Sequence, residues 1–217
     1  MQAIVSRLAA VTRPRTTVDA PPDVREALER VGVPKRYLDV RLHDLRAKSP
    51  DAKTLATVER VAFYIANLEV MVREGRGLVL AGQTGRGKTS LSVCVLRALI
   101  ELHVGQGQFA TAPGLHERLN VLRDTNREEW ARLESRLVKG RLLVLDDLGA
   151  ENLTAAVQAR WDALVTDRYN EQRSLIVTTN LTPKNIAQRY GERILSRLAA
   201  TCDVVTFVGP DLRGASA

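Results

Sequence analysis

The stretch GQTGRGKT at residues 82–89 decides the fold of this chain. It has the spacing G-x-x-x-x-G-K-[ST], and it lies between a short apolar run at 77–82 and a helical pattern at 88–102. The glycines let the backbone curl so that successive N–H groups point inward, and the start of a helix adds the positive end of its dipole. The stretch therefore predicts a strand, a phosphate-binding loop and a helix in succession.

Two side chains of this loop predict binding of phosphates and of a metal ion. Lys88 supplies a point charge for the β and γ phosphates, and Thr89 supplies a hydroxyl ligand for Mg²⁺. We therefore expect a nucleoside triphosphate and Mg²⁺ as cofactors. The expected nucleotide contacts are Gly82, Gln83, Thr84, Gly85, Arg86, Gly87, Lys88, Thr89 and Ser90.

Two adjacent carboxylates end a second apolar run, LLVLDD at 142–147. Ligands of open α/β sheets bind outside the carboxyl ends of the strands, so both carboxylates are expected beside the phosphate loop. Asp146 is expected to hold Mg²⁺, directly or through water. Asp147 is expected to orient or deprotonate the attacking water.

Asn180 ends the next β-branched run, LIVTTN. A polar side chain at the tip of a neighbouring strand can bond the attacking water or the γ-phosphate. Thr178, Thr179 and Asn180 could equally be turn-forming residues before Pro183. The order of glycine loop, paired carboxylates and strand-end Asn favours the functional interpretation.

Apolar or β-branched runs alternate with helical patterns along the chain. The runs lie at 77–82, 107–112, 141–149, 174–180 and 203–208. Strands that alternate with helices form a parallel sheet covered on both faces. The predicted fold class is therefore α/β, a P-loop NTPase with a five-stranded parallel sheet.

The regions outside the strands suggest how the chain is organised. Residues 50–75 carry apolar side chains at steps of three and four, which predicts one long helix capped by Ser49. TRPRTTVDAPPD at 12–23 has the composition of an exposed linker. We expect three regions: an N-terminal arm and linker at 1–30, an ATPase domain at 31–208 and a tail at 209–217.

Composition and charge narrow the class of protein. The net charge of +7 and the isoelectric point near 9.8 suit a polyanionic partner. No stretch approaches the roughly 18 apolar residues that a membrane span needs. Cys94 and Cys202 match no metal-ligand spacing, which predicts buried thiols in a reducing compartment and no structural zinc. These features predict a cytoplasmic protein without membrane contact.

Two groups of arginines lie outside the predicted nucleotide site. In GERILSRLAA at 191–200, Arg193 and Arg197 are one helical turn apart. They could face solvent, bind an acidic partner or contact a phosphate in a neighbouring molecule.

The segment at 113–136 is helical and basic. Its possible contacts to a DNA backbone are Arg118, Arg123, Arg127 and Arg132. The alternative, of equal weight, is a solvated face neutralised by Glu117, Asp124, Glu128 and Glu129.

These stretches resemble the AAA+ ATPases, in particular the DnaC-like helicase loaders and the IstB-like transposition ATPases. The matching stretches are GQTGRGKT, LLVLDDLG, W…LVTDRYN, LIVTTNL and GERILSRL. The resemblance implies the sheet order 5-1-4-3-2 and an ATP site at an interface between subunits. It also implies that Asn180 is the sensor residue and that GVPKRYLD at 32–39 lies beside the adenine. An arginine finger would reach the neighbour's γ-phosphate, with Arg197 our first choice and Arg193 in a supporting role.

The chain departs from the general AAA+ pattern at two places. Only GPDLRGASA follows the fifth strand, so we expect no C-terminal helical lid, as in the loaders. Asp147 takes the place of the usual glutamate and is one methylene shorter, which leaves the rate of hydrolysis open.

The function that the resemblance implies is ATP-dependent loading of a replicative DNA helicase onto single-stranded DNA. Self-association would complete the ATP sites in trans. The alternatives are an IstB-like transposition helper and a nucleotide-gated adaptor with little hydrolysis. The N-terminal arm, with Ile4, Val5, Leu8 and Val11 on one face, is either the helicase contact or a disordered tail.

Overall fold

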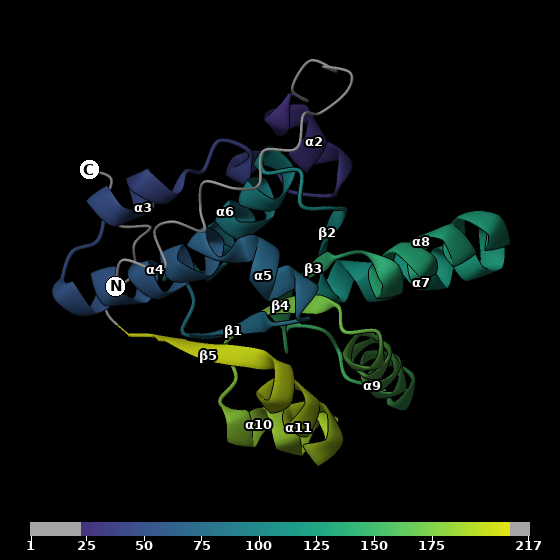
Figure 1. The fold of residues 1–217 in the computed structure, drawn as a ribbon. Helices are drawn as coiled ribbons and strands as arrows, with labels where there is room; N and C mark the ends of the chain where they lie inside the picture. Colours follow the sequence, from purple (N-terminus) through teal and green to yellow (C-terminus); the bar gives the residue numbers. More distant parts are fainter. Residues whose placement is uncertain (1–22, 209–217) are drawn as a thin grey trace.

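A parallel β-sheet forms the centre of the computed structural model, which describes residues 23–208 (Figure 1). The strands are β1 (Gly77–Gly82), β2 (Gly107–Thr111), β3 (Leu142–Leu148), β4 (Ser174–Thr179) and β5 (Cys202–Phe207). They lie in the order β2-β3-β4-β1-β5, and all neighbouring pairs are parallel. Read from the other edge, this is the order 5-1-4-3-2, so the predicted fold is confirmed.

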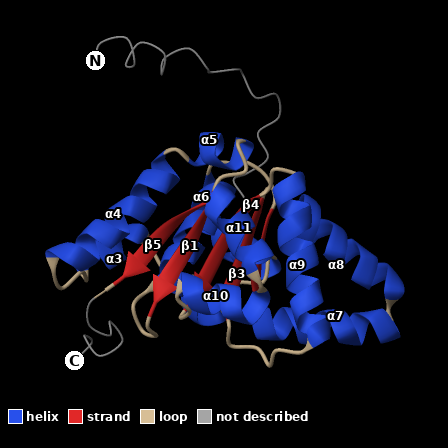
Figure 2. Ribbon diagram, turned by 90° about the horizontal axis from the view of Figure 1, so that it is seen from below, coloured by secondary structure: helices blue, strands red, loops and turns tan. Residues whose placement is uncertain are grey.

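Helices cover both faces of the sheet (Figure 2). In chain order they are α2 (Val24–Arg30), η1 (Lys35–Tyr37), α3 (Leu42–Ala47), α4 (Ala52–Ala66), α5 (Leu68–Arg73), α6 (Lys88–Glu101), α7 (Ala112–Thr125), α8 (Arg127–Lys139), α9 (Ala155–Asn170), α10 (Pro183–Tyr190) and α11 (Glu192–Thr201). Successive residues of a strand point to opposite faces, which gives two cores. Leu78 and Leu80 pack with α2, α4, α5 and α6, whereas Val79 and Ala81 pack with α7 to α11.

The long helix expected at 50–75 is two helices, so that prediction is wrong in its continuity. Asn67, with φ −110° and ψ 19°, ends α4 and precedes α5. The N-cap is Asp51, whose carboxylate accepts a hydrogen bond from the Thr54 N–H at 2.7 Å. Ser49 instead donates to the carbonyl of Leu45 at 2.8 Å. The apolar spacing continues through the break, which explains why the pattern predicted a single helix.

The basic segment after β2 also forms two helices, α7 and α8, which lie side by side and project away from the sheet (Figure 1). Asn126 separates them, and its side chain accepts from the Glu129 N–H at 3.0 Å to cap α8. Its backbone, with φ −151°, lies outside the helical region. The break turns the chain back and makes this pair of helices a projecting hairpin.

The described chain begins with a helix that belongs to the core. Leu28 of α2 is 0% exposed and packs against α6, although we placed residues 1–30 in the arm. Helix α2 thus shares its buried surface with the core of the domain, across the boundary expected at residue 31. The remaining predictions for the arm, and the tail at 209–217, lie outside the described residues.

Two further predictions concern the thiols and the membrane. Cys94 and Cys202 are free and buried, as expected. Burial raises the pKa of Cys94 to about 12 and that of Cys202 to about 11. Between residues 23 and 208, no helix has the length and apolar character needed to cross a membrane.

Candidate nucleotide-binding site

The glycine loop joins β1 to α6 at the carboxyl edge of the sheet. Gly87, the N-cap of α6, has φ 81°, a conformation that other residues rarely adopt. Gly82 lies so close to β5 that a Cβ there would stand 2.5 Å from the carbonyl oxygen of Phe207. The sequence therefore folds into this loop because glycine is required at both of its ends.

The Arg86 side chain links the loop to β5, the edge strand of the sheet. Its guanidinium donates to the carbonyl of Phe207 at 2.9 Å and to Oε1 of Gln83 at 2.8 Å. These two side chains, which we predicted as nucleotide contacts, are thus directed toward β5 and each other. The structure gives them a part in shaping the loop.

Lys88 lies inside the loop and is 5% exposed. Its ammonium donates to the carbonyls of Gly82 and Gln83 at 2.6 and 2.8 Å and to Oδ1 of Asn180 at 2.8 Å. Asn180 also donates through Nδ2 to the hydroxyl of Thr84 at 3.3 Å. The end of β4 is therefore joined to the phosphate loop.

Asp146 is buried at the end of β3, where it is 3% exposed. Its Oδ1 accepts from the hydroxyls of Thr89 and Thr178 at 2.9 and 2.7 Å. Burial raises the pKa of Asp146, and the hydrogen bond from Thr178 opposes that shift. A carboxylate and a hydroxyl in contact match the oxygen ligands that Mg²⁺ prefers. The residues present thus fit the cation that the sequence predicts.

Asp147 is exposed although its neighbour is buried. Its φ of 56° is left-handed, and the pairing of β3 with β4 shifts between Leu145 and Leu148. The Asp147 N–H donates to the hydroxyl of Thr178 at 2.9 Å. This irregularity turns the Asp147 carboxylate out of the sheet and toward the phosphate-binding loop.

A cleft of about 520 Å³ brings these residues together. One wall is the loop and the first turn of α6, and Asp147 and Asn180 also line it. The opposite wall consists of Arg36, Tyr37, Asp39, Val40, Asp44, Leu45 and Lys48. Arg36 stacks over the ring of Tyr37, with its Cζ 4.6 Å from the centroid. The segment expected beside the adenine therefore lines the cleft.

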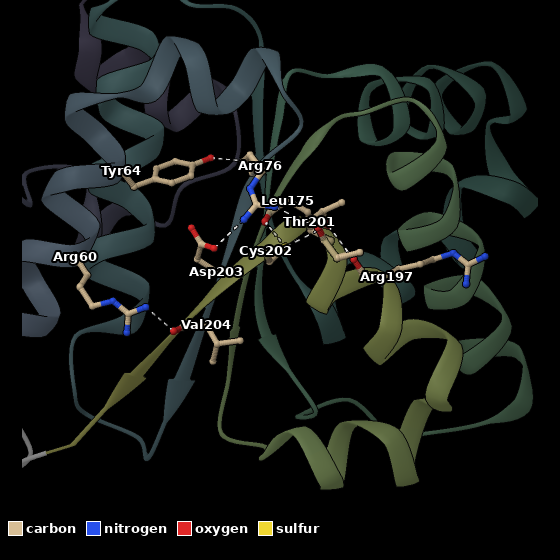
Figure 3. Close-up of polar contacts among 10 residues, drawn as sticks. Arg60, Tyr64, Arg76, Leu175, Arg197, Thr201, Cys202, Asp203 and Val204 are labelled. Carbon is tan, nitrogen blue, oxygen red and sulfur yellow. Dashed lines mark hydrogen bonds and ion pairs between the residues drawn. The ribbon is translucent and has the colours of Figure 1, made fainter. Parts of the chain in front are cut away.

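The arginine pair lies elsewhere, on α11. Arg193 pairs with Asp162 of α9 at 3.5 Å. Arg197 donates to the carbonyl of Arg193 at 3.2 Å, and its Cζ lies 5.8 Å from the ring centroid of Tyr169. Figure 3 shows the Arg197 side chain directed away from β5. Among residues 23–208, none from α11 lines the cleft, so one chain does not bring these arginines to its own nucleotide site.

The arginines of the α7–α8 hairpin mostly face carboxylates. Arg118 pairs with Glu129 at 3.4 Å, and Arg123 pairs with Asp124 at 3.2 Å. Arg132 pairs with Glu128. All of these side chains are largely exposed, so such pairs open readily. The neutralised, solvated face is thus present in the free chain.

The sequence pattern missed two residues that hold the carboxylates in place. Thr178 is 0% exposed and bonds both Asp146 and the Asp147 N–H. Glu151, four residues after Asp147, is buried and bonds the Gly149 N–H at 3.0 Å. The position of Thr178 before Pro183 also suits a turn, and an acidic residue in a loop, such as Glu151, gives no signal of burial.

Comparisons with known proteins agree with this geometry. The family model described as IstB-like ATP binding protein matches residues 34–215. The crystal structure of the DnaC helicase loader shares 27% identity and a TM-score of 0.73, covering 81% of this chain and 100% of that one. The DnaI structure shares 22% identity and a TM-score of 0.68, covering 82% and 96%.

A more distant structure has the same fold. The replication initiator DnaA bound to AMPPCP and single-stranded DNA has a TM-score of 0.65 at 14% identity, covering 81% of this chain and 52% of that one. Among curated proteins, no sequence matches with significance.

Proposed function

This chain belongs to the IstB-like ATP binding protein family, and on that premise we propose that it is an ATPase that loads a replicative DNA helicase onto single-stranded DNA. One observation carries the ATPase part of the proposal. Lys88, Asp147 and Asn180 come from separate elements and line the same cleft, with buried Asp146 bonded to Thr89 at its edge. Mutual placement of a cation, paired carboxylates and a strand-end amide is what phosphoryl transfer to water requires.

Each residue has a distinct part in this proposal. The loop N–H groups and Lys88 bind the phosphates, and Thr89 with Asp146 holds the metal. Mg²⁺, when bound, neutralises charge that develops on the phosphates. Asp147 orients the attacking water and accepts its proton, because its carboxylate is exposed in the cleft. Asn180, already in contact with Lys88, senses the γ-phosphate end of the site.

The loading part of the proposal is supported by the DnaC helicase loader, which aligns over its whole length. We infer that the partners are a hexameric replicative helicase, single-stranded DNA and further copies of this chain. The IstB-like family membership favours a second candidate, a helper ATPase that binds DNA and recruits a transposase.

The ATPase proposal is tested with Lys88→Ala. Loss of Lys88 removes the cation that the loop surrounds, so binding of a fluorescent ATP analogue should fall at least about tenfold. Lys184→Ala, which changes an exposed lysine on α10, is the matched control and should bind normally. Equal binding by both variants would exclude this loop as the nucleotide site.

The loading proposal is tested by supplying the helicase. We expect the wild-type chain, with ATP, to place a hexameric helicase on circular single-stranded DNA, measured by co-elution of helicase and DNA. Lys88→Ala should fail. ATP-dependent binding to duplex DNA with capture of a transposase, and without helicase capture, would establish the helper function instead.

A further inference from the structure

The turn that carries Asp147 is closed by a buried carboxylate. Glu151 is 5% exposed, and its Oε2 accepts from the Gly149 N–H at 3.0 Å. The Ala150 N–H donates to the carbonyl of Asp147 at 3.1 Å. Asp147 and Gly149 have φ of 56° and 107°, so this turn holds left-handed conformations, one of them at a non-glycine residue. Such a backbone persists only where surrounding contacts fix it.

The second oxygen of Glu151 is held from α10. The hydroxyl of Tyr190, the last residue of α10, donates to Glu151 Oε1, and Tyr190 is 3% exposed. Arg189 donates through Nε to the Tyr190 hydroxyl at 3.2 Å and through Nη2 to the carbonyl oxygen of Glu151. The carboxylate is thus bonded on both oxygens, as a buried charge must be.

The same turn touches the loop that carries Asn180. The hydroxyl of Thr179 donates to the carbonyl of Leu148 at 2.6 Å. The side chain of Leu181 lies 2.8 Å from the position that a Cβ on Gly149 would take. Glu151 therefore lies where the Asp147 turn, the Asn180 loop and the end of α10 meet.

We propose that Glu151 is a positioning residue that fixes the direction of the Asp147 carboxylate, and that Tyr190 holds Glu151 for this task. Glu151 does not line the cleft, so it acts through the turn and not by contact with the nucleotide. This inference rests on the proposed ATPase function. Releasing the turn would let Asp147 leave its left-handed conformation, which misplaces the group that activates water. A small misplacement of a reacting group lowers the rate without lowering binding.

Tyr190→Phe is the decisive variant, because it removes one hydroxyl and keeps the ring. Its matched control is Tyr64→Phe. Tyr64 is 2% exposed, and its hydroxyl donates to the carbonyl of Arg76 at 2.7 Å, at the opposite end of β1 from the loop (Figure 3). We expect Tyr190→Phe to lower kcat about tenfold while the Kd for ATP changes less than about twofold. Tyr64→Phe should leave both quantities unchanged.

Substitutions of Glu151 provide a rescue series. Glu151→Ala should lower kcat more than Tyr190→Phe does, because both hydrogen bonds are lost. Glu151→Gln should restore part of the rate, since its amide oxygen still accepts one of the two. Equal kcat for Tyr190→Phe and Tyr64→Phe, or equal loss of rate in Glu151→Ala and Glu151→Gln, would overturn the positioning role.

A measurement independent of hydrolysis separates this inference from the proposed function. Amide hydrogen exchange of Gly149 and Ala150 in the whole chain should be faster in Tyr190→Phe and unchanged in Tyr64→Phe. If Tyr190→Phe exchanges faster but the wild-type chain hydrolyses no ATP, the ATPase proposal is rejected and the contact of Tyr190 with the turn stands. Unchanged exchange with unchanged kcat would reject the inference and leave the ATPase standing.

Discussion

At the scale of single residues, the two adjacent carboxylates show how position changes chemistry. Asp146 is buried among threonine hydroxyls, whereas Asp147 is exposed within the irregularity in β3. The sequence alone predicted both as site residues, because polar groups at a strand's carboxyl end face the ligand side. It could not predict their different burial, since the left-handed Asp147 depends on Thr178 and Glu151 from outside the motif.

This difference predicts separate effects for two isosteric variants. Asp146→Asn should weaken Mg²⁺-dependent binding of nucleotide, because an amide is a poorer ligand for a hard cation than a carboxylate. Asp147→Asn should bind ATP normally and hydrolyse it about 10²–10⁴-fold more slowly, because the proton acceptor is lost. Titration of a fluorescent ATP analogue with and without Mg²⁺ measures binding, and phosphate release measures the rate of hydrolysis. Asp124→Asn, on the α7 surface, is the control, and equal loss of binding in both site variants would contradict separate roles.

At the scale of elements, the five strands follow directly from apolar runs and their spacing. The strand order came from the resemblance, because period and composition do not say which strands pair. The helix breaks at Asn67 and Asn126 were missed: apolar positions recur across the first, and the second lies within a wholly polar stretch at 123–129 that carries no proline or glycine to mark a break. The packing of α2 on the core has no signal in the local sequence either, because it depends on α6, which lies far along the chain.

Arg168 is the clearest test of how one element holds others. It lies on α9, is 1% exposed, and donates to the carbonyls of Leu137, Val138, Gly140 and Ser174. It thereby joins the end of α8 to the start of β4. Arg168→Ala removes a donor from all four of these carbonyls and should lower the free energy of unfolding by about 3 kcal/mol or more.

Urea unfolding measures this effect against two comparisons. Arg168→Lys should recover only part of the stability, because a single ammonium replaces a planar guanidinium that donates from several nitrogens. Arg132→Ala, which breaks an exposed ion pair on α8, should cost about 0–1 kcal/mol. A loss for Arg168→Ala no larger than that for Arg132→Ala would show that the carbonyls find other donors.

At the scale of the whole molecule, the cleft and the arginine helix are separate surfaces of one chain. The amino end of α11 follows Tyr190 and so adjoins the Glu151 cluster. At its carboxyl end, Arg76 donates to the carbonyl of Ala200 at 3.2 Å and pairs with Asp203 at 2.9 Å (Figure 3). The helix is therefore held at both ends by the rest of the chain, and Arg197 would reach a nucleotide by assembly with a second chain.

The last prediction tests that assembly. Arg197→Ala should fold and bind ATP normally, because among residues 23–208 this side chain donates within α11 and lies near Tyr169, away from the cleft. A finger supplied in trans is worth about 10³–10⁵ in rate, so assembly-dependent hydrolysis should be lost. Mixing Arg197→Ala with Lys88→Ala should restore part of the activity, because each chain supplies the half-site that the other lacks. If assembled Arg197→Ala hydrolyses ATP at the wild-type rate and Arg193→Ala does not, the arginine finger is Arg193. Wild-type turnover by both would leave α11 without a part in catalysis.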